Sequence, residues 1–269
     1  MNHRSRDFAL MQAIFRVDGG SIEVGPNAAG PWDPRMQHGS APAGLAVWAA
    51  ESIPTSVPMR VARVTVDLMR PVPLAPLTLE TEVLREGRKI QLCAVRLRAD
   101  GVLTVSATVL RVKLTAETMP PDVGGPKVTL PRPDESPEDP AQFSNSPFVM
   151  GMQLRAARGT FGVRGPGAIW YRVKRPFVEG ADVSQAMRAV IAADFCNGTS
   201  AALDFREYTF LNADLTVSMA REPVGEWILL DAESWIGPEG AGLAMARLAD
   251  TSGYFGRCVQ SLVIEKRRA

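Results

Sequence analysis

The stretch Gln185-Ala-Met-Arg-Ala-Val-Ile-Ala-Ala-Asp194-Phe-Cys-Asn-Gly198 decides the fold of this chain. Between its first residue and Asp194, Arg188 alone interrupts the apolar side chains. A helix made of this segment would be apolar on nearly every side, and such helices are buried in a core. The sequence therefore predicts a buried helix that carries one carboxylate close to its end.

The flanks of this segment carry helix-end signals. Asp182 and Gln185 stand three residues apart, which suits a reciprocal cap at a helix start, and Asn197-Gly198 suits a helix stop. Asp194 would then lie near a buried C-terminal end, where burial and the helix dipole both disfavour its charged form. A carboxylate in such a place is a candidate for chemistry; the alternative is a surface acid on the last turn.

Composition limits the classes of partner. The chain has 269 residues, enough for one large domain or two small ones, and its 30 basic and 29 acidic residues give a net charge of +1. This balance gives no electrostatic reason to expect nucleic acid or an anionic membrane as a partner. The same residue content offers no apolar run long enough to insert into a bilayer.

The cysteines favour a reducing compartment. Cys93, Cys196 and Cys258 are odd in number and far apart, so they predict neither a disulfide framework nor a metal site. The first residues also lack the apolar core of a signal peptide. We expect a cytoplasmic protein with no metal and no cofactor.

The first half of the chain combines a second apolar helix with alternating strands. Residues 41–52 form the helix, with Ser40 as the expected N-cap, after a Gly- and Pro-rich loop that ends in His38-Gly39-Ser40. Residues 8–17 suggest a strand or a short helix. Period-2 alternation predicts strands at residues 21–24, 61–69, 77–84, 89–98 and 103–114.

The second half repeats this order. Strands are expected at residues 151–163 and 168–174, then the Asp194 helix, then strands at 213–220, 226–235, 242–249 and 256–266. Arg70 and Arg221 end similar strand segments 151 residues apart, and Glu51 stands where Asp194 stands in the helix alignment. Aligning the last strands sets Ala107 against Gln260, so Glu51 lacks an amide partner and is expected to be a solvated or paired acid.

A proline-rich segment separates the halves. Residues 119–148 contain eight prolines and no apolar periodicity. We expect an N-terminal unit at residues 1–115, a crossover linker at 116–149 that is extended rather than disordered, and a C-terminal unit at 150–269.

Each repeat is thus a helix wrapped by an antiparallel sheet, and two such repeats in tandem form the double hotdog fold of the α+β class. The sequence resembles the double-hotdog acyl-CoA thioesterase family over essentially the whole chain except the linker. The motifs that carry the resemblance are Trp32 through His38-Gly39, Val66-Asp-Leu-Met-Arg-Pro-Val-Pro-Leu74, Gly87-Arg88, Ala193-Asp194-Phe195, Asn212-Ala-Asp-Leu-Thr216, Gly225-Glu-Trp227 and Val259-Gln260-Ser261.

The resemblance implies a three-residue catalytic site. By position, Asp194 and Gln260 would bind and activate a water, and Asn212 would complete the set where other members more often have Thr. Asp194 would act as general base, and the two amides can orient the water because each both donates and accepts.

The oxyanion of the reaction is expected at a buried helix start, either at Gly39-Ser40 or at Ser184-Gln185. His38, Gly39 and Ser40 are therefore the predicted substrate-binding residues, and the acyl chain would lie between helix and sheet.

Structural interpretations compete at each position. Gln260 could face solvent from an edge strand, Asn212 could cap a turn, and His38 could be a loop residue that bonds to backbone. Arg70 and Arg221 could contact a CoA phosphate, although strand-end arginines are usually solvated. The five tryptophans are expected in the core.

The predicted function is hydrolysis of acyl-CoA to fatty acid and CoA, by a homo-oligomer that is a dimer or larger. Two alternatives are open: a non-catalytic acyl-CoA-binding protein, and an enoyl-CoA hydratase, which needs a His paired with an acid. The hydratase is disfavoured because His38 belongs to the half without Asp194.

Overall fold

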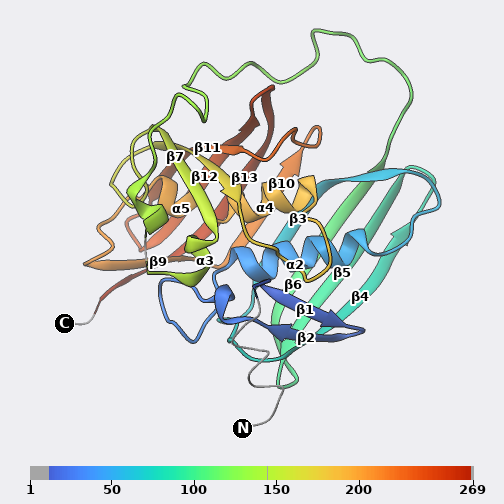
Figure 1. Ribbon diagram of the computed structural model, residues 1–269, viewed down its shortest axis with the longest axis horizontal. Helices are drawn as coiled ribbons and strands as arrows, with labels where there is room; N and C mark the ends of the chain where they lie inside the picture. The colour runs from blue at the N-terminus through green and yellow to red at the C-terminus, as the bar shows by residue number, and fades with distance from the viewer. Residues whose placement is uncertain (1–11, 144, 268–269) are drawn as a thin grey trace.

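A single antiparallel sheet of thirteen strands curls around two helices in the computed structural model, which describes residues 12–143 and 145–267 (Figure 1). Residues 1–11 of the expected N-terminal unit and 268–269 of the expected C-terminal unit lie outside the described residues. The first part of the element predicted at residues 8–17 therefore lies outside them too.

The N-terminal half wraps six strands around the helix α2 (Ser40–Glu51). The helix is buried along almost its whole length, as its all-round apolar sequence predicts. The other elements are β1 (Phe15–Asp18), β2 (Ser21–Val24), the short 3-10 helix η1 (Pro26–Ala28), β3 (Met59–Leu68), β4 (Leu77–Glu86), β5 (Ile90–Ala99) and β6 (Val102–Lys113).

The C-terminal half is built in the same way around α4 (Gln185–Ala193). Its elements are β7 (Met152–Arg158), β8 (Gly167–Val173), α5 (Cys196–Thr199), β9 (Tyr208–Asn212), β10 (Asp214–Met219), β11 (Ile228–Ile236), β12 (Ala241–Asp250) and β13 (Gly253–Lys266). The strand expected at residues 151–163 is shorter, and β9, which pairs with β13, was not predicted.

The two halves meet edge to edge. Strand order runs β1-β2-β4-β5-β6-β3 through the first half and β10-β13-β12-β11-β8-β7 through the second. Antiparallel pairing of β3 with β10 joins them, with Thr65 opposite Thr216. Because the order away from this joint is the same on both sides, the tandem double hotdog is confirmed.

The strand registers correct one detail of the repeat alignment. Val66 pairs with Ala107 in the first half, and its counterpart Val217 pairs with Cys258 in the second. Ala107 therefore corresponds to Cys258, and not to Gln260. The first-half residue that corresponds to Gln260 is then Val109, so the first half still has no amide at this position.

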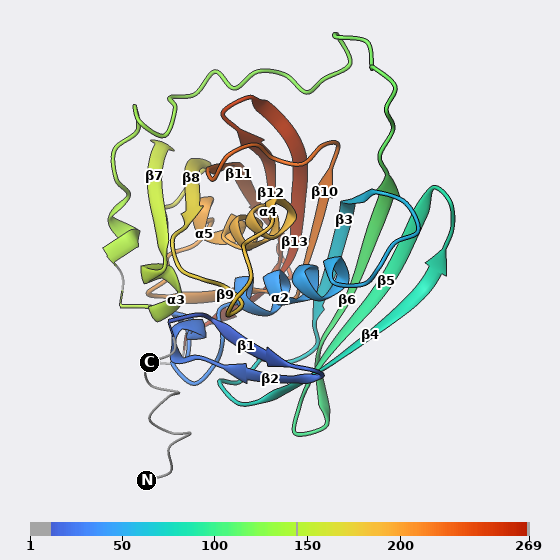
Figure 2. The ribbon, with the colours of Figure 1, turned by 45° about the vertical axis from the view of Figure 1, so that its right-hand side comes forward.

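The two long helices lie side by side and antiparallel (Figures 1 and 2). The hydroxyl of Ser40, at the start of α2, lies 3.1 Å from the carboxylate of Asp194, at the end of α4. At the other end, Ser184 before α4 donates to Glu51 at the end of α2 over 2.6 Å. Each helix thus presents its positive end to the acid of the other.

The helix ends differ from the predicted caps. Ser184, and not the Asp182–Gln185 pair, caps α4, since its hydroxyl accepts from Met187 N over 3.1 Å. The helix ends at Ala193, before the predicted stop at Asn197-Gly198. Those two residues lie in the second short helix, α5. At α2 the N-cap is Gly39, and Ser40 is the first helical residue, whose side chain makes no cap.

The proline-rich crossover arches away from the body between β6 and β7 (Figure 1). It is mostly without regular structure, but it contains two short helices, η2 (Pro140–Phe143) and α3 (Pro147–Met150). Its last residues return to the first half, where Phe148 N donates to Ala29 O over 3.1 Å.

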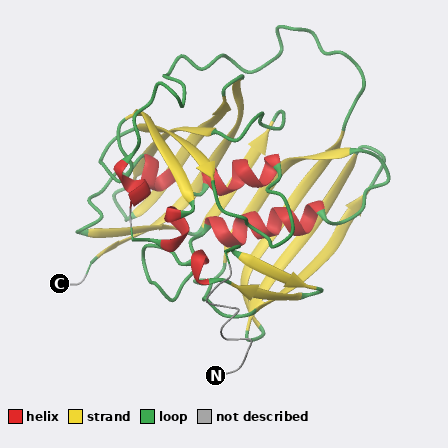
Figure 3. Cartoon of the chain, viewed as in Figure 1, coloured by secondary structure: helices red, strands yellow, loops and turns green. Residues whose placement is uncertain are grey.

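One apolar core fills the space between sheet and helices and includes residues of both halves. Figure 3 shows how few helices the sheet encloses. Trp170 belongs to the interior, but Trp32 is 37% and Trp235 58% exposed, so the prediction of five core tryptophans is wrong. Within the described chain, no helix is both long and apolar enough to cross a bilayer.

Candidate active site

Asp194 lies at the junction of the two helices, in the wall of a pocket of about 530 Å³. It is 5% exposed, so the predicted buried carboxylate is present. His38, Gly39 and Asn212 line the same pocket, whereas Ser40 and Gln260 do not. Apolar side chains supply much of the remaining wall, among them Trp32, Met36, Pro42, Leu68, Met69, Val72, Leu211 and Val263.

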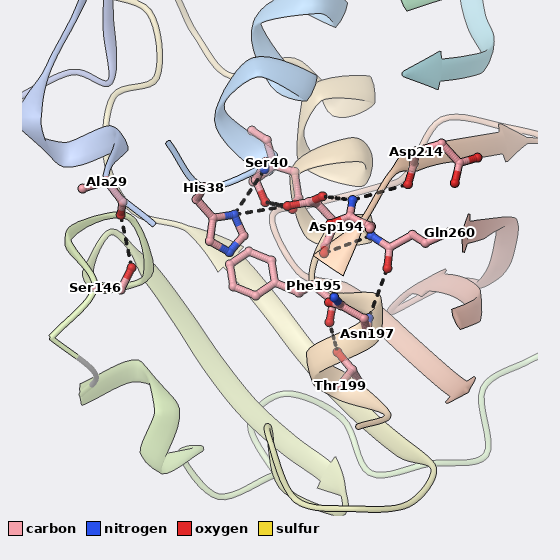
Figure 4. Close-up of polar contacts among 12 residues, drawn as sticks. Ala29, His38, Ser40, Ser146, Asp194, Phe195, Asn197, Thr199, Asp214 and Gln260 are labelled. Atoms are coloured by element: carbon pink, nitrogen blue, oxygen red, sulfur yellow. Dashed lines mark hydrogen bonds and ion pairs between the residues drawn. The ribbon is translucent and has the colours of Figure 1, made fainter. Parts of the chain in front are cut away.

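The carboxylate of Asp194 is surrounded by polar groups from three elements (Figure 4). Asn212 Nδ2 donates to Oδ1 over 2.9 Å. On the other oxygen, Oδ2, Ser40 Oγ lies at 3.1 Å and His38 Nδ1 at 3.2 Å. Both oxygens of the carboxylate therefore lie within hydrogen-bonding distance of a polar side chain.

Ser40 is a positioning residue rather than a wall of the pocket. It is fully buried, and its hydroxyl lies 2.9 Å from Ile191 O as well as 3.1 Å from Asp194 Oδ2. These contacts tie the first turn of α2 to the last turn of α4. The prediction that Ser40 contacts substrate therefore has no support from its surroundings.

His38 packs against two aromatic rings. Its ring centroid lies 4.7 Å from that of Phe148 and 4.6 Å from that of Phe195, and all three rings are stacked. Nδ1 lies 3.2 Å from both Ser40 N and Asp194 Oδ2. One nitrogen either accepts or donates, so it can serve only one of these partners at a time.

This position corrects the argument that His38 is remote from Asp194. The antiparallel helices bring the start of α2 to the end of α4, so the two residues meet although they come from different halves. His38 also bonds to backbone, as the structural interpretation expected, through Ser40 N.

Gly39 allows the close approach of the two helix ends. A Cβ atom at this position would lie 2.8 Å from both carboxylate oxygens of Asp194. Real Cβ contacts are essentially never so short, so only glycine leaves the carboxylate in place. Gly39 is also the N-cap of α2, where the helix dipole favours negative charge. The next N–H groups are not free, since Ser40 N and Ala41 N donate to His38 and residue 42 is proline.

Asn212 lies at the end of β9, the strand that was not predicted. Its Nδ2 donates to Asp194 Oδ1 and, over 3.3 Å, to Asp214 O. Because a carbonyl only accepts, the second contact fixes which end of the amide is nitrogen, and Oδ1 remains as an acceptor. The turn-capping role and the site role therefore coexist in one side chain.

Gln260 contacts the backbone beside Asp194 instead of its carboxylate. Its Nε2 donates to Asp194 O over 3.1 Å, and its Oε1 accepts from Asn197 N over 3.2 Å. The residue is fully buried on β13, which has neighbours on both sides, so the solvent-facing interpretation is wrong. Its contacts fix the turn between α4 and α5.

Three residues near the site were not predicted to belong to it. Phe148, from the crossover, and Phe195 pack against His38, and Asn197 lines the pocket and donates from Nδ2 to Phe210 O over 2.9 Å. The sequence offered a signal for Phe195 alone, because this aromatic residue directly follows the candidate acid Asp194. The described residues contain no group of three or more His, Cys, Asp or Glu side chains placed to hold a metal.

A buried carboxylate, a histidine, an amide and a glycine-capped helix start lie together at a pocket between two hotdog units, and these groups can take part in acid–base chemistry.

Comparison with known proteins gives the family. Residues 28–112 match the model of the acyl-CoA thioesterase N-terminal domain, and residues 128–264 match that of the C-terminal domain. The chain belongs to the acyl-CoA thioesterase family, and it is a thioester hydrolase. No curated protein matches the sequence.

Solved structures share the fold at low sequence identity. A hot dog fold protein from Alicyclobacillus acidocaldarius has a TM-score of 0.71 at 16% identity and covers 100% of both chains. The tesB protein of Mycobacterium avium subspecies paratuberculosis has 0.66 at 16%, covering 96% of this chain and 98% of that one. Acyl-CoA thioesterase II TesB2 from Mycobacterium marinum has 0.65 at 12%, covering 94% and 95%.

Proposed function

We propose that Asp194 is the general base that activates water for attack on the thioester carbonyl. The observation that carries this proposal is the placement of its nearly buried carboxylate in the pocket wall, with Asn212 and His38 beside it. A positioned base of this kind typically contributes on the order of 10²- to 10⁴-fold to the rate.

Asn212 orients the water in this proposal. Both hydrogens of its amide are engaged, so its free Oδ1 accepts a hydrogen bond from one O–H of a water. The other O–H of that water donates to Asp194. Gln260 takes a positioning role, because its contacts hold the backbone at Asp194 and Asn197. Direct water binding by Gln260 is not part of the proposal.

The oxyanion of the tetrahedral intermediate would form at the start of α2. Gly39 lines the pocket there, and its own N–H and the helix dipole favour a developing negative charge. When the C–S bond breaks, the proton held by Asp194 passes to the thiolate. The products are a carboxylic acid and free CoA.

A panel of acyl-CoAs with a thiol-reactive dye tests this function. Release of thiol from at least one chain length, lost in Asp194→Asn, supports it. Thermal stabilisation by acyl-CoA without turnover would instead favour the non-catalytic binding protein.

We further propose a cytoplasmic homo-oligomer with unit boundaries at residues 1–115 and 150–269. The free, buried state of all three cysteines fits a reducing compartment. Exposed apolar side chains on the sheet, such as Trp235 and Leu84, offer surface for a second copy. Light scattering of the purified protein measures the oligomeric state.

A further inference from the structure

The start of α2 has few backbone donors to offer an oxyanion. Ser40 N donates to His38 Nδ1 over 3.2 Å, and Ala41 N donates to His38 O over 2.9 Å. Residue 42 is proline and has no N–H. Gly39 N makes no hydrogen bond with the described residues, so it alone of residues 39–42 remains for the pocket. A second donor for the oxyanion would have to come from a side chain.

His38 has a ring nitrogen that the described residues leave unengaged. The residue lines the pocket, and its side chain is 11% exposed. Nδ1 lies 3.2 Å from both Ser40 N and Asp194 Oδ2 (Figure 4), whereas Nε2 makes no hydrogen bond with the described residues and is not sealed in the interior. Stacking against Phe148 and Phe195 fixes the plane of the ring. Because Nδ1 is engaged, Nε2 is the nitrogen that a group bound in the pocket can reach.

The neighbours of Nδ1 decide where the imidazole hydrogen sits while an oxyanion exists. At that stage of the proposed reaction, Asp194 has taken a proton from the attacking water. Asn212 donates to Oδ1 of this carboxyl group, so the proton belongs on Oδ2. Oδ2–H and Ser40 N–H are then two donors, each with its heavy atom 3.2 Å from Nδ1, and Nδ1 acts as an acceptor. A neutral imidazole that accepts at Nδ1 carries its hydrogen on Nε2.

We infer that Nε2–H of His38 is a donor of the oxyanion hole, beside the N–H of Gly39. This inference rests on the proposed function. The oxygen of water forms the new C–O bond as the carbonyl π electrons move onto the carbonyl oxygen, and Asp194 takes the proton of the water. Nε2–H donates a hydrogen bond to that oxygen and keeps its hydrogen. When the C–S bond breaks, the carbonyl re-forms and His38 is unchanged.

Three substitutions at His38 separate the two ring nitrogens. His38→Phe keeps a flat ring against Phe148 and Phe195 but has no nitrogen, and it should lower kcat by on the order of 10²- to 10³-fold, the usual effect of a lost oxyanion donor. His38→Gln places an amide N–H near the position of Nε2 and should recover at least about 10-fold of that loss. His38→Asn places its amide near the position of Nδ1 and should be as slow as His38→Phe.

A substrate analogue without the carbonyl oxygen is the control for binding. An S-alkyl-CoA has a thioether in place of the thioester, so it cannot use an oxyanion hole and is not hydrolysed. As a competitive inhibitor it should have the same Ki in the wild type and in all three variants, because the donor acts on the transition state. Its binding also reports that each variant is folded.

The outcomes distinguish this inference from the proposed function. An unchanged kcat in His38→Phe would overturn the inference. A His38→Gln variant that is no faster than His38→Asn would also overturn it, because the role would not lie at Nε2. A higher Ki for the S-alkyl-CoA in His38→Phe would make His38 a residue that shapes the pocket. A wild-type protein that hydrolyses no acyl-CoA would instead overturn the proposed function.

Discussion

The two ends of the helix pair are built alike and yet differ in what surrounds the acid. Asp194 ends α4 and faces Ser40 of α2, while Glu51 ends α2 and faces Ser184 of α4. The same arrangement of acid, serine and helix start thus occurs twice, as the duplication of the fold requires.

Apart from the serine, different groups surround the two acids. Asp194 also meets His38 and Asn212 and lines the pocket. Glu51 does not line that pocket, and burial raises its pKa although the hydrogen bond from Ser184 opposes the shift. Asn212 belongs to β9, a strand that lies outside the duplicated strand order. Duplication supplied the framework twice, and residues particular to one end completed a site only there.

The largest expected effect comes from Asp194→Asn. It removes the base and keeps the shape, so kcat should fall by roughly 10³-fold while acyl-CoA still binds. Glu51→Gln is the matched control at the other end and should keep activity within about twofold. Steady-state hydrolysis and thermal shift with acyl-CoA measure both. A dead Glu51 variant beside an active Asp194 variant would reverse the assignment.

The amides beside Asp194 should have the next largest effect. Asn212→Ala removes the water-orienting oxygen and should lower kcat by about 10²-fold with little loss of stability. Gln260→Ala leaves two buried backbone groups unpaired, so it should also lower the free energy of unfolding by about 1–3 kcal/mol. Chemical denaturation separates the two variants, and unchanged turnover in both would make these residues purely structural.

A smaller loss is expected from Gly39→Ala. The added Cβ would push the Asp194 carboxylate away from the helix start, and a displacement of this kind can cost about 10- to 100-fold in kcat. Gly87→Ala is the control, because a Cβ there would meet Ile90 O at 3.5 Å, an ordinary contact. Equal activity of the two variants would mean that the helix ends tolerate separation.

The smallest effect concerns the pH dependence of stability at Glu51. Because burial raises its pKa in the folded state above the ordinary 4.5, its contribution is fully present below pH 4.5 and is lost as pH rises through the folded pKa. Glu51→Gln is neutral at every pH, so it should be slightly more stable than the wild type at pH 7. Thermal melts between pH 4 and 8 should show this difference disappearing toward low pH; a constant difference would contradict it.

Local pattern was enough to predict much of the fold. The all-round apolar segment ending at Asp194 predicted a buried helix, and period-2 alternation located strands such as residues 21–24 and 77–84 in the first half. The strand ending at Asn212 was missed because its pairing with β13 is a long-range contact that leaves little trace in a five-residue segment.

The site was predictable as a set of residues but not as a geometry. Four candidates from the sequence lie at or next to one another, namely Asp194, Asn212, Gln260 and His38. Their contacts were not predictable, because hydrogen-bond partners between residues far apart in the chain depend on how the elements pack. For that reason Gln260 was expected to hold water, although its contacts are with backbone.

The sequence by itself determined the repeat, the two buried helices and the family, because periodicity and motif order are local properties of the chain. Tertiary structure alone decided which side chains meet. Antiparallel packing of α2 against α4 set His38 beside Asp194 across the two halves, and it placed the positive end of one helix at the acid of the other. Only that packing, with glycine at position 39, lets the carboxylate, the histidine and the helix start approach within hydrogen-bonding distance.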